Sequence, residues 1–285
     1  MAITTDFKNI EDELEKRLFT QIKAGKIEGE QWYKNPLAWL LICFNNPLNF
    51  KNSNGELVVF HNNKKSVSKY IKGHSQIHYG VGVGETELEL ITFELEQSGF
   101  VNIEAVDINK TFVELFSENL KDKLLEFGEN SINAKLTQDL FQNYVVEFNE
   151  KVVHICLGST LGNFDNSSDE LWNIFSKNAK KGDLLIVGIK TNKYFDVDFI
   201  KCQTNKYYPM LVLSHIKNIN PSLISWEKSK ENGYIRMIYD SVEVFRTRRF
   251  SKNKLISEAE NYGFKEIDSW TCEYGHSLIV LFKKE

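Results

Sequence analysis

Residues 76–90 read QIHYGVGVGETELEL, which joins a β-strand pattern, a glycine-rich loop and the start of a helix pattern. Gly80, Gly82 and Gly84 allow the backbone to turn tightly and to come close to a ligand. The helix that follows offers backbone N–H groups without partners in its first turn. The spacing is G-x-G-x-G rather than the G-x-G-x-x-G of dinucleotide-binding loops. The loop therefore predicts a ligand site, although alone it is also compatible with an ordinary tight turn.

The chain around this loop alternates between strand patterns and helix patterns. Strands are expected at 76–81, 103–107, 133–137, 152–158 and 184–190, and helices at 85–98, 110–126 and 169–180. Strands such as VVHICLG at 152–158 are apolar almost throughout, which is typical of a parallel sheet buried on both faces. Two closing strands are expected at 265–273 and 277–283. These patterns predict an α/β fold with a seven-stranded, mostly parallel sheet and helices on both faces.

The regions outside this alternation predict other structure. Residues 5–24 and 36–44 have apolar residues at helical spacing, whereas 45–64 are rich in Asn, Lys and Ser and predict a loop. Residues 191–234 interrupt the alternation and have about the size of an inserted lid. Residues 235–247 alternate as extended chain does and predict a hairpin with its turn at the Asp-Ser pair of this segment.

The composition excludes several classes of protein. The 285 residues are 42% hydrophobic and 26% charged with a formal net charge of −4, unlike basic nucleic-acid-binding domains. No stretch reaches the roughly 18 apolar residues of a membrane span, and the N-terminus has no signal-peptide pattern. The four Cys and six His lack the spacing of metal ligands. We therefore expect a cytoplasmic protein without a metal, nucleic-acid or membrane partner, and leave its oligomeric state open.

Acidic residues follow the next two expected strands after the glycine loop. Asp107 lies about 20 residues beyond the loop, where a carboxylate can accept hydrogen bonds from both hydroxyls of a ribose. Asp107 alone could equally cap a helix. Asp139 could accept from the amine of an adenine, with Leu140 or Phe141 against the ring. Because these positions share the carboxyl edge of one sheet, together they predict a nucleoside cofactor. The expected binding residues are Tyr79, Gly80, Gly82, Gly84, Thr86, Asp107, Ile108, Asp139, Leu140, Gly158 and Ser159.

Two further segments carry a resemblance to a known family. Residues 154–164 read HICLGSTLGNF, and residues 181–188 read KGDLLIVG. They resemble the signature of the histidine-specific methyltransferases, which include the Nα-trimethylating enzyme of ergothioneine biosynthesis. The resemblance runs from about 75 to 190 and resumes more weakly at 242–285. It implies a Rossmann-like class I methyltransferase that uses S-adenosyl-L-methionine and releases S-adenosyl-L-homocysteine.

The resemblance also implies roles for residues of the substrate site. Asn163 matches the family's Asn beside the substrate amine, where an amide oxygen can accept from the amine and orient it. Glu243 and Tyr207 are further candidates for catalytic contacts. The expected substrate-binding residues are Phe164, Tyr208, Arg246 and Arg248.

The sequence departs from the family at positions that touch both cofactor and substrate. The acidic residue that usually precedes the glycine loop is absent, since His78 and Tyr79 occupy the place. Near the C-terminus, Arg248 aligns with a carboxylate that holds the imidazole of histidine. An arginine cannot lose its proton and binds carboxylates bidentately. We therefore expect a substrate other than free histidine, with an anionic group near Arg246, Arg248 or Arg249. Alternation places the first two on one face of a strand and the third on the other.

The expected function is methyl transfer from S-adenosyl-L-methionine to an amine of an amino acid or small peptide-like metabolite. O-methylation of a carboxylate is the first alternative, because an arginine can hold a carboxylate as a handle or as the acceptor. A non-catalytic cofactor-binding or partner protein is the second, and a nicotinamide oxidoreductase is the third. The expected segments are an N-terminal helical cap at 1–70, a cofactor-binding core at 71–190, an inserted substrate cap or lid at 191–249, and a C-terminal helix with closing strands at 250–285.

Overall fold

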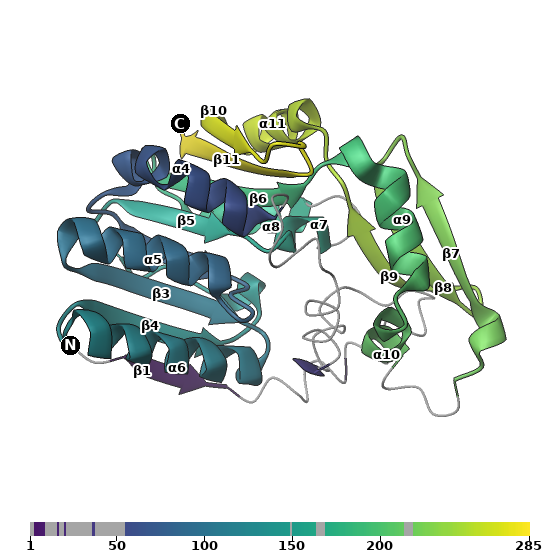
Figure 1. The fold of residues 1–285 in the computed structure, drawn as a ribbon, viewed down its shortest axis with the longest axis horizontal. Helices are drawn as coiled ribbons and strands as arrows, with labels where there is room; N and C mark the ends of the chain where they lie inside the picture. Colours follow the sequence, from purple (N-terminus) through teal and green to yellow (C-terminus); the bar gives the residue numbers. More distant parts are fainter. Residues whose placement is uncertain are drawn as a thin grey trace.

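Figure 1 shows a central β-sheet between helices, with a second, smaller sheet to one side. The structure is a computed structural model, and it describes residues 3–8, 16, 20, 36–37, 55–148, 150–163, 169–213 and 219–285. The strands of the central sheet are β1 (Thr4–Phe7), β2 (Ser75–Tyr79), β3 (Val101–Asp107), β4 (Ile132–Gln138), β5 (Val152–Cys156), β6 (Leu184–Lys190), β10 (Phe264–Thr271) and β11 (Ser277–Lys284).

Within the described residues the central sheet has eight strands, in the order β1-β4-β3-β2-β5-β6-β11-β10. Neighbouring strands pair in parallel from β1 to β6, whereas β11 runs antiparallel to both β6 and β10. The mostly parallel α/β fold and its antiparallel closing pair are therefore confirmed. Successive strands run outward in opposite directions from β2 and β5. Ligands of α/β sheets bind at such a switch point, beyond the carboxyl ends of the strands.

The sheet has one strand more than the seven expected. Residues 5–7 were expected to begin a helix, but together with Thr4 they pair in parallel with β4 as strand β1. The Thr4 hydroxyl also donates to the carbonyl of Ala134 at 3.2 Å. Two adjacent β-branched residues suit a strand better than the first turn of a helix, and the unpaired edge of β4 offers them a partner. Apart from Lys16 and Thr20, residues 9–24 lie outside the described residues, as do residues 38–44 of the second expected helix.

Helices cover both faces of the central sheet, as the sequence predicts. They are α4 (Glu56–Ile71), α5 (Glu85–Ser98) and α6 (Lys110–Phe127) on one face, with α8 (Asp169–Asn178) and α11 (Lys252–Asn261) on the other. None of the described helices has the length and apolar character needed to cross a membrane. Residues 85–98, 110–126 and 169–180 were expected to be helical, and the observed helices agree within two residues.

Helix α4 corrects the loop expected at 45–64 from Glu56 onward, whereas residues 45–54 lie outside the described residues. Val59, Phe60, Val67 and Ile71 recur at helical spacing and are fully buried against β5, β6 and β11. The polar run Asn62–Lys65 between them, which suggested a loop, forms the outer surface of the helix. Because α4 packs directly on the sheet, we propose that the core begins at this helix rather than at residue 71.

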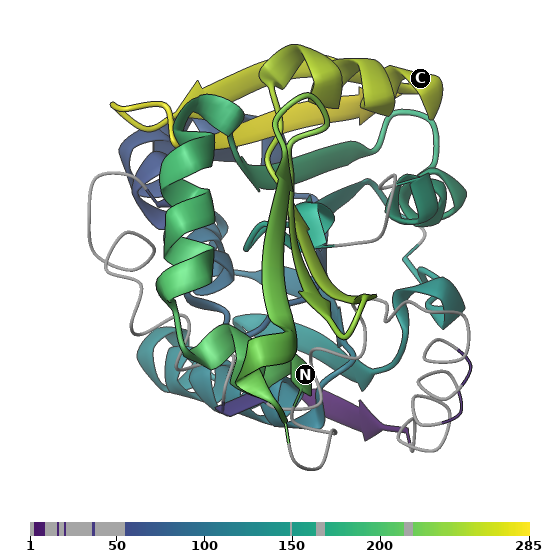
Figure 2. The same ribbon diagram turned by 90° about the vertical axis from the view of Figure 1, so that its right-hand side faces the viewer.

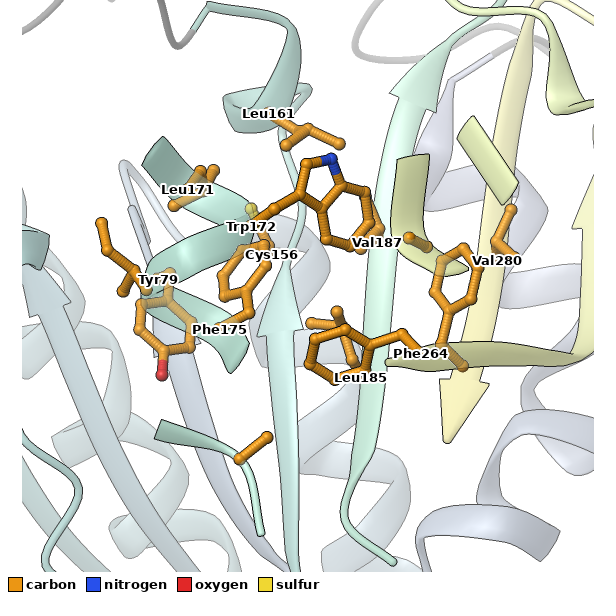
Figure 3. Packing of buried hydrophobic residues seen from close by; sticks show 14 of the residues in the cluster. Tyr79, Cys156, Leu161, Leu171, Trp172, Phe175, Leu185, Val187, Phe264 and Val280 are labelled. Carbon is orange, nitrogen blue, oxygen red and sulfur yellow. The ribbon is translucent and has the colours of Figure 1, made fainter. Parts of the chain in front are cut away.

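The largest aromatic cluster lies between α8 and the sheet (Figure 3). Trp172 is fully buried, with its ring centroid 5.9 Å from Phe175 and 6.2 Å from Phe264. Tyr79 meets Phe175 edge to face at 5.2 Å. Such pairs add about 0.5–1.5 kcal/mol each to the gain from burial alone. These ring contacts therefore fix α8 against β2 and β10.

The segment between β6 and α11 forms a separate layer beyond the carboxyl ends of the parallel strands (Figures 1 and 2). It contains α9 (Phe195–Thr204), α10 (Tyr207–Leu213) and an antiparallel sheet of β7 (Ile224–Ser229), β8 (Tyr234–Tyr239) and β9 (Val242–Arg248). We call this layer the cap. Asp240 and Ser241 join β8 to β9 with φ of 48° and 66°, which is the turn expected for a two-residue hairpin.

Candidate functional site

A cavity of about 210 Å³ lies between the carboxyl edge of the central sheet and the cap. The glycine loop forms one wall, and residues of α10 and β9 form part of another. Of the residues expected to bind ligands, the structure brings a large group together around it. Those that line the cavity are Gly80, Gly82, Gly84, Thr86, Asp107, Ile108, Leu140, Gly158, Ser159, Asn163 and Tyr208.

The glycine loop is held by backbone hydrogen bonds and leaves open space on its cavity side. Gly80 N–H donates to the carbonyl of Val106 at 2.8 Å, and Gly84 N–H donates to that of Val81 at 2.8 Å. Gly82 has a φ of +52°, and a Cβ added there would meet no atom within 4 Å. Because the backbone itself borders this free space, a ligand can approach the loop closely.

Asp107 is buried and bonded to the loop. One carboxylate oxygen accepts from Gly82 N–H at 3.0 Å, and the other accepts from Asn109 N–H at 2.8 Å. Burial raises the pKa of Asp107 to about 6, although these N–H bonds act in the opposite direction. The side chain of Asn109, not of Asp107, caps α6 by accepting from Thr111 and Phe112. Asp107 is therefore not the helix cap that its position alone allowed.

Three carboxylates that the sequence did not indicate also line the cavity, Glu56, Glu85 and Glu87. Glu56 begins α4 and accepts from Gly158 N–H at 2.8 Å and from the Ser159 hydroxyl at 3.0 Å. A Cβ at Gly188 would lie 2.2 Å from Glu56, so only glycine lets this side chain reach the strand end. Burial raises the pKa of Glu56. Burial, with the charges of Glu56 and Asp107, raises the pKa of Glu87 to about 8.

His78 does not replace the acidic residue that is absent before the glycine loop. Its ring is fully buried, and its Nε2 atom lies 3.0 Å from Oε1 of Gln76. Burial lowers the pKa of His78 to about 3, so the ring is neutral at physiological pH. Any carboxylate that serves the cavity must therefore come from another position, and Glu56 and Glu87 are available.

The cap side of the cavity carries cations. Lys190 ends β6, and Arg249 follows β9; both line the cavity. The Arg249 Nε atom donates to Asp198 of α9 at 2.6 Å. Burial acts to lower the pKa of Arg249, but the Asp198 carboxylate outweighs it and the pKa is raised. Asp198 keeps a lowered pKa against its own burial because Arg249 and His276 are beside it. Both partners are therefore charged.

Two residues expected to bind the cofactor do not line the cavity. Tyr79 is buried in the aromatic cluster, and its hydroxyl lies 3.0 Å from Nδ1 of His154. Asp139 accepts from Leu140 N–H at 2.8 Å and from the side chain of Asn143 at 3.1 Å. Strand alternation explains Tyr79, which points to the face covered by α8. Asp139 closes the turn after β4 and shapes the wall only through Leu140.

Four expected substrate residues also lie away from the cavity wall. Arg248 pairs with Glu258 of α11, and Arg246 pairs with Glu243 at 2.6 Å. Both guanidinium groups lie over the ring of Tyr234, so they share one face of β9, as alternation predicts. That face turns away from the cavity, and Arg249 is the arginine that reaches it. Tyr207 packs into the apolar centre of the cap. Phe164 lies outside the described residues.

The cavity-lining residues that the sequence did not indicate differ in whether a sequence pattern marks them. Lys190 is the last residue of an expected strand, so the rule that indicated Asp107 could have indicated it too. Thr247 and Ser277 line the cavity from the cap and the closing pair, and no local pattern marks either. Within the described residues, no group of three or more His, Cys, Asp or Glu side chains is placed to hold a metal ion.

Comparisons with known proteins fit this geometry. The model of a protein family described as "Histidine-specific methyltransferase, SAM-dependent" matches residues 48–197. A search of curated protein sequences gave no significant match.

Solved structures with the same fold are distant in sequence. The CcbJ methyltransferase from Streptomyces caelestis has 11% identity over 90% of this chain and 98% of its own, with a TM-score of 0.51. The magnesium protoporphyrin IX methyltransferase from Synechocystis PCC 6803 with bound SAH has 13% identity over 87% of this chain and 93% of its own, with a TM-score of 0.50. At this identity the likeness shows the fold.

Proposed function

Because the chain belongs to the family of histidine-specific, SAM-dependent methyltransferases, we propose that it methylates an amine of an amino acid or small peptide-like metabolite other than free histidine. The family match covers the glycine loop, Asp107 and Asn163. It favours a methyltransferase over a nicotinamide oxidoreductase and over a non-catalytic protein. The observation that carries the proposed substrate class is a single cavity lined by both carboxylates and cations.

The cavity fits S-adenosylmethionine in the features that the cofactor requires. The open space before Gly82 accepts a ligand against the backbone, and Asp107 keeps lone pairs for ribose hydroxyls after its two N–H bonds. Ile108, Leu140 and Phe141 offer an apolar surface to an adenine. Glu56 supplies a carboxylate for the ammonium of the methionine part. The bound cofactor supplies an activated methyl group that carries its own leaving group.

The protein's part in the reaction is then to orient the substrate and to take up a proton. An amine becomes a nucleophile only after it loses its ammonium proton. Glu87 lines the cavity, and with a pKa of about 8 its carboxylate is a stronger base than an ordinary one and can take up that proton once it is ionised, as the pH approaches 8. Lys190 and Arg249 attract the carboxylate of an amino acid, which directs its amine toward the glycine-loop side. Glu87 and Arg249 are buried, which strengthens their interactions.

Methylation of a carboxylate oxygen is the second candidate, and Arg249 is the observation that favours it. A guanidinium can hold a carboxylate either as a handle or as the methyl acceptor. The two products differ in chemistry, because a methyl ester is released by mild base and an N-methyl group is not. Mass spectrometry of the product before and after base treatment separates the candidates.

The first experiment is calorimetric titration with S-adenosylmethionine and S-adenosylhomocysteine, with NAD as a control ligand. We expect micromolar binding of the first two, lost by a factor of about 100 or more in Asp107→Ala. Asp196→Ala is the matched control, because this carboxylate is 55% exposed and pairs with Lys228 outside the cavity. Methyl transfer to a panel of amino acids and dipeptides then tests the substrate class. Absence of cofactor binding, or transfer to none of these compounds, would overturn the proposal.

A further inference from the structure

A continuous chain of hydrogen bonds connects the cap to Asn163. His276 lies in the turn between β10 and β11, with its Nε2 atom 3.2 Å from Asp198 Oδ1. Arg249 donates from Nε to the other Asp198 oxygen at 2.6 Å and from Nη1 to the hydroxyl of Thr247 at 2.9 Å. The Thr247 hydroxyl donates to Oδ1 of Asn163 at 2.9 Å. All five residues are under a tenth exposed, so water competes little for these bonds.

Packing holds Asn163 at the end of this chain. Asn163 closes α7 (Thr160–Asn163), a short helix after β5 that packs against β9. A Cβ at Gly162 would lie 2.7 Å from the carbonyl oxygen of Arg248. Glycine is therefore required at this position for α7 to approach the β9 backbone. The approach brings the Asn163 amide within reach of Thr247.

The donors and acceptors along the chain of hydrogen bonds determine whether the oxygen or the nitrogen of the Asn163 amide faces the cavity. A guanidinium only donates, so the Thr247 oxygen must accept from Arg249. The hydroxyl proton of Thr247 then needs an acceptor, which is Oδ1 of Asn163. The amide is planar, and its nitrogen points away from its oxygen. Asn163 therefore offers the cavity a hydrogen-bond donor, whereas the sequence suggested an oxygen that accepts from an amine.

Arg249 adds donors at the same place. Its Nε atom donates to Asp198, and its Nη1 atom donates to the Thr247 hydroxyl and the carbonyl of Arg248. Among the described residues Nη2 has no hydrogen-bond partner, and the side chain lines the cavity beside Asn163. The Thr247 oxygen between these two groups already accepts from Arg249, so Asn163 and Arg249 present donors to the cavity, which suits an anion and disfavours an ammonium.

We propose that Asn163 and Arg249 form a subsite for the carboxylate of the substrate, and that Thr247 and Asp198 are its positioning residues. The inference rests on the proposed function, since it names the group by which that substrate is held. Through the same chain of bonds, residues of α9, β9 and the β10–β11 turn hold the subsite in place without touching the substrate's reacting atom.

Asn163→Asp tests the subsite directly, because it keeps the shape of the side chain and replaces the donor by an anionic acceptor. The probes are amino acids and their primary amides, titrated into protein saturated with S-adenosylhomocysteine. In the parent protein we expect at least one acid to bind tenfold or more tightly than its amide. In Asn163→Asp the acid should lose at least tenfold, with the amide little changed. Retained or improved binding of the acid would show that Asn163 accepts from an amine, and would overturn the subsite.

Thr247 tests the positioning role. Thr247→Val removes the bond to Asn163 with little change in shape, and should raise KM for the acid about tenfold with a smaller change in kcat. Thr247→Ser keeps the hydroxyl and should restore KM. Equal effects of Val and Ser at 247 would contradict the positioning role.

Arg249→Lys tests the second member of the subsite, and Arg248→Lys is its matched control, since only Arg249 lines the cavity. Only Arg249→Lys should reduce the preference for acid over amide.

The failure of this inference can be told apart from that of the proposed function. If the parent protein binds neither S-adenosylmethionine nor S-adenosylhomocysteine, the methyltransferase proposal fails. If it binds S-adenosylhomocysteine but prefers no acid in the panel over its amide, only the carboxylate subsite is overturned.

Discussion

The two sides of the cavity are built in different ways. The glycine-loop side uses backbone groups of one continuous segment, joined to Asp107 through Gly82 N–H. The cap side uses five side chains from four separate places in the sequence, which meet in the chain from His276 to Asn163. The first depends on the shape of the backbone, and the second depends on buried charges that satisfy one another.

The difference determines what each side tolerates. The three glycines of the loop have positive φ, so an added Cβ strains the backbone at each of them, whereas the loop has few charges to lose. A buried ion pair is costly to interrupt, because removal of one partner leaves the other charge without compensation. We therefore expect steric substitutions to damage the loop side most and charge substitutions to damage the cap side most.

Gly84→Ala should give the largest effect. Gly84 begins α5 at a φ of +74°, and a Cβ there would lie 2.3 Å from the ring of the buried Phe116. Left-handed backbone and overpacking each cost about 1–3 kcal/mol, so we expect a loss of about 3 kcal/mol or more in the free energy of unfolding. Denaturant unfolding measures it.

Gly99→Ala is the matched control at the other end of the same helix. Gly99 has a φ of +71°, but a Cβ there would meet nothing within 4 Å. Its replacement should cost only about 1 kcal/mol, from backbone strain. Equal losses for the two variants would mean that the contact with Phe116 adds nothing.

Arg248→Met should give the next largest effect and concerns the cap. Arg248 is 3% exposed and pairs with Glu258, which is 18% exposed. The variant leaves that carboxylate partly buried and unpaired, at a cost of about 2–3 kcal/mol. Binding of amino acids to the S-adenosylhomocysteine complex should not change, because Arg248 does not line the cavity. A variant with parental stability but weakened substrate binding would reverse the roles that we give to Arg248 and Arg249.

Glu87→Gln tests a buried carboxyl on the glycine-loop side, because its effect on the free energy of unfolding should depend on pH. Burial gives the native carboxyl a pKa of about 8, well above its usual value near 4.5, so the native protein retains this proton longer than the unfolded chain does. This group therefore makes the parent less stable as pH rises from about 4.5 to 8. The variant should gain on the parent across that window, by up to about 1.4 kcal/mol per pH unit. Urea unfolding at pH 5, 6.5 and 8 measures the gain, and parallel curves would contradict it.

Ser241→Gly should give the smallest effect and the opposite sign. Ser241 has a φ of 66° in the β8–β9 turn, where glycine avoids steric strain. We expect a gain of about 0.5 kcal/mol in thermal unfolding experiments. Ser225→Gly is the control, because Ser225 lies in strand β7 and pairs with Ile238 of β8. Glycine at this position should cost about 0.5–1 kcal/mol. A loss at both positions would mean that the turn is not strained.

Most of the central fold could be predicted from sequence because its signals are local. Apolar strands and amphipathic helices were marked by their own residues, and α5 begins and ends where the pattern predicted. Helix α4 was missed because its exposed Asn62–Lys65 run has the composition of a loop. Its buried residues become evident only when the sheet that they contact is known.

The same distinction between local and long-range signals applies to the residues of the site. The positions of Gly82 and Asp107 followed from the rule that ligands bind beyond strand ends. Alternation correctly placed Arg246 and Arg248 on a common face, but it could not say which face of β9 turns toward the core. That orientation depends on contacts such as Gly162 with the Arg248 carbonyl, which join residues far apart in the sequence.

The two outermost strands of the central sheet also bear on how copies of this protein meet one another. Within the described residues, one border is β1, only four residues long and containing Asp6. The other is β10, which carries Lys265, Glu266 and Asp268 and has a bulge between the last two. A short border and a bulged, charged one both offer a poor template for edge-to-edge pairing and fibril growth. Both edges of the described sheet therefore disfavour pairing with a strand of a second molecule.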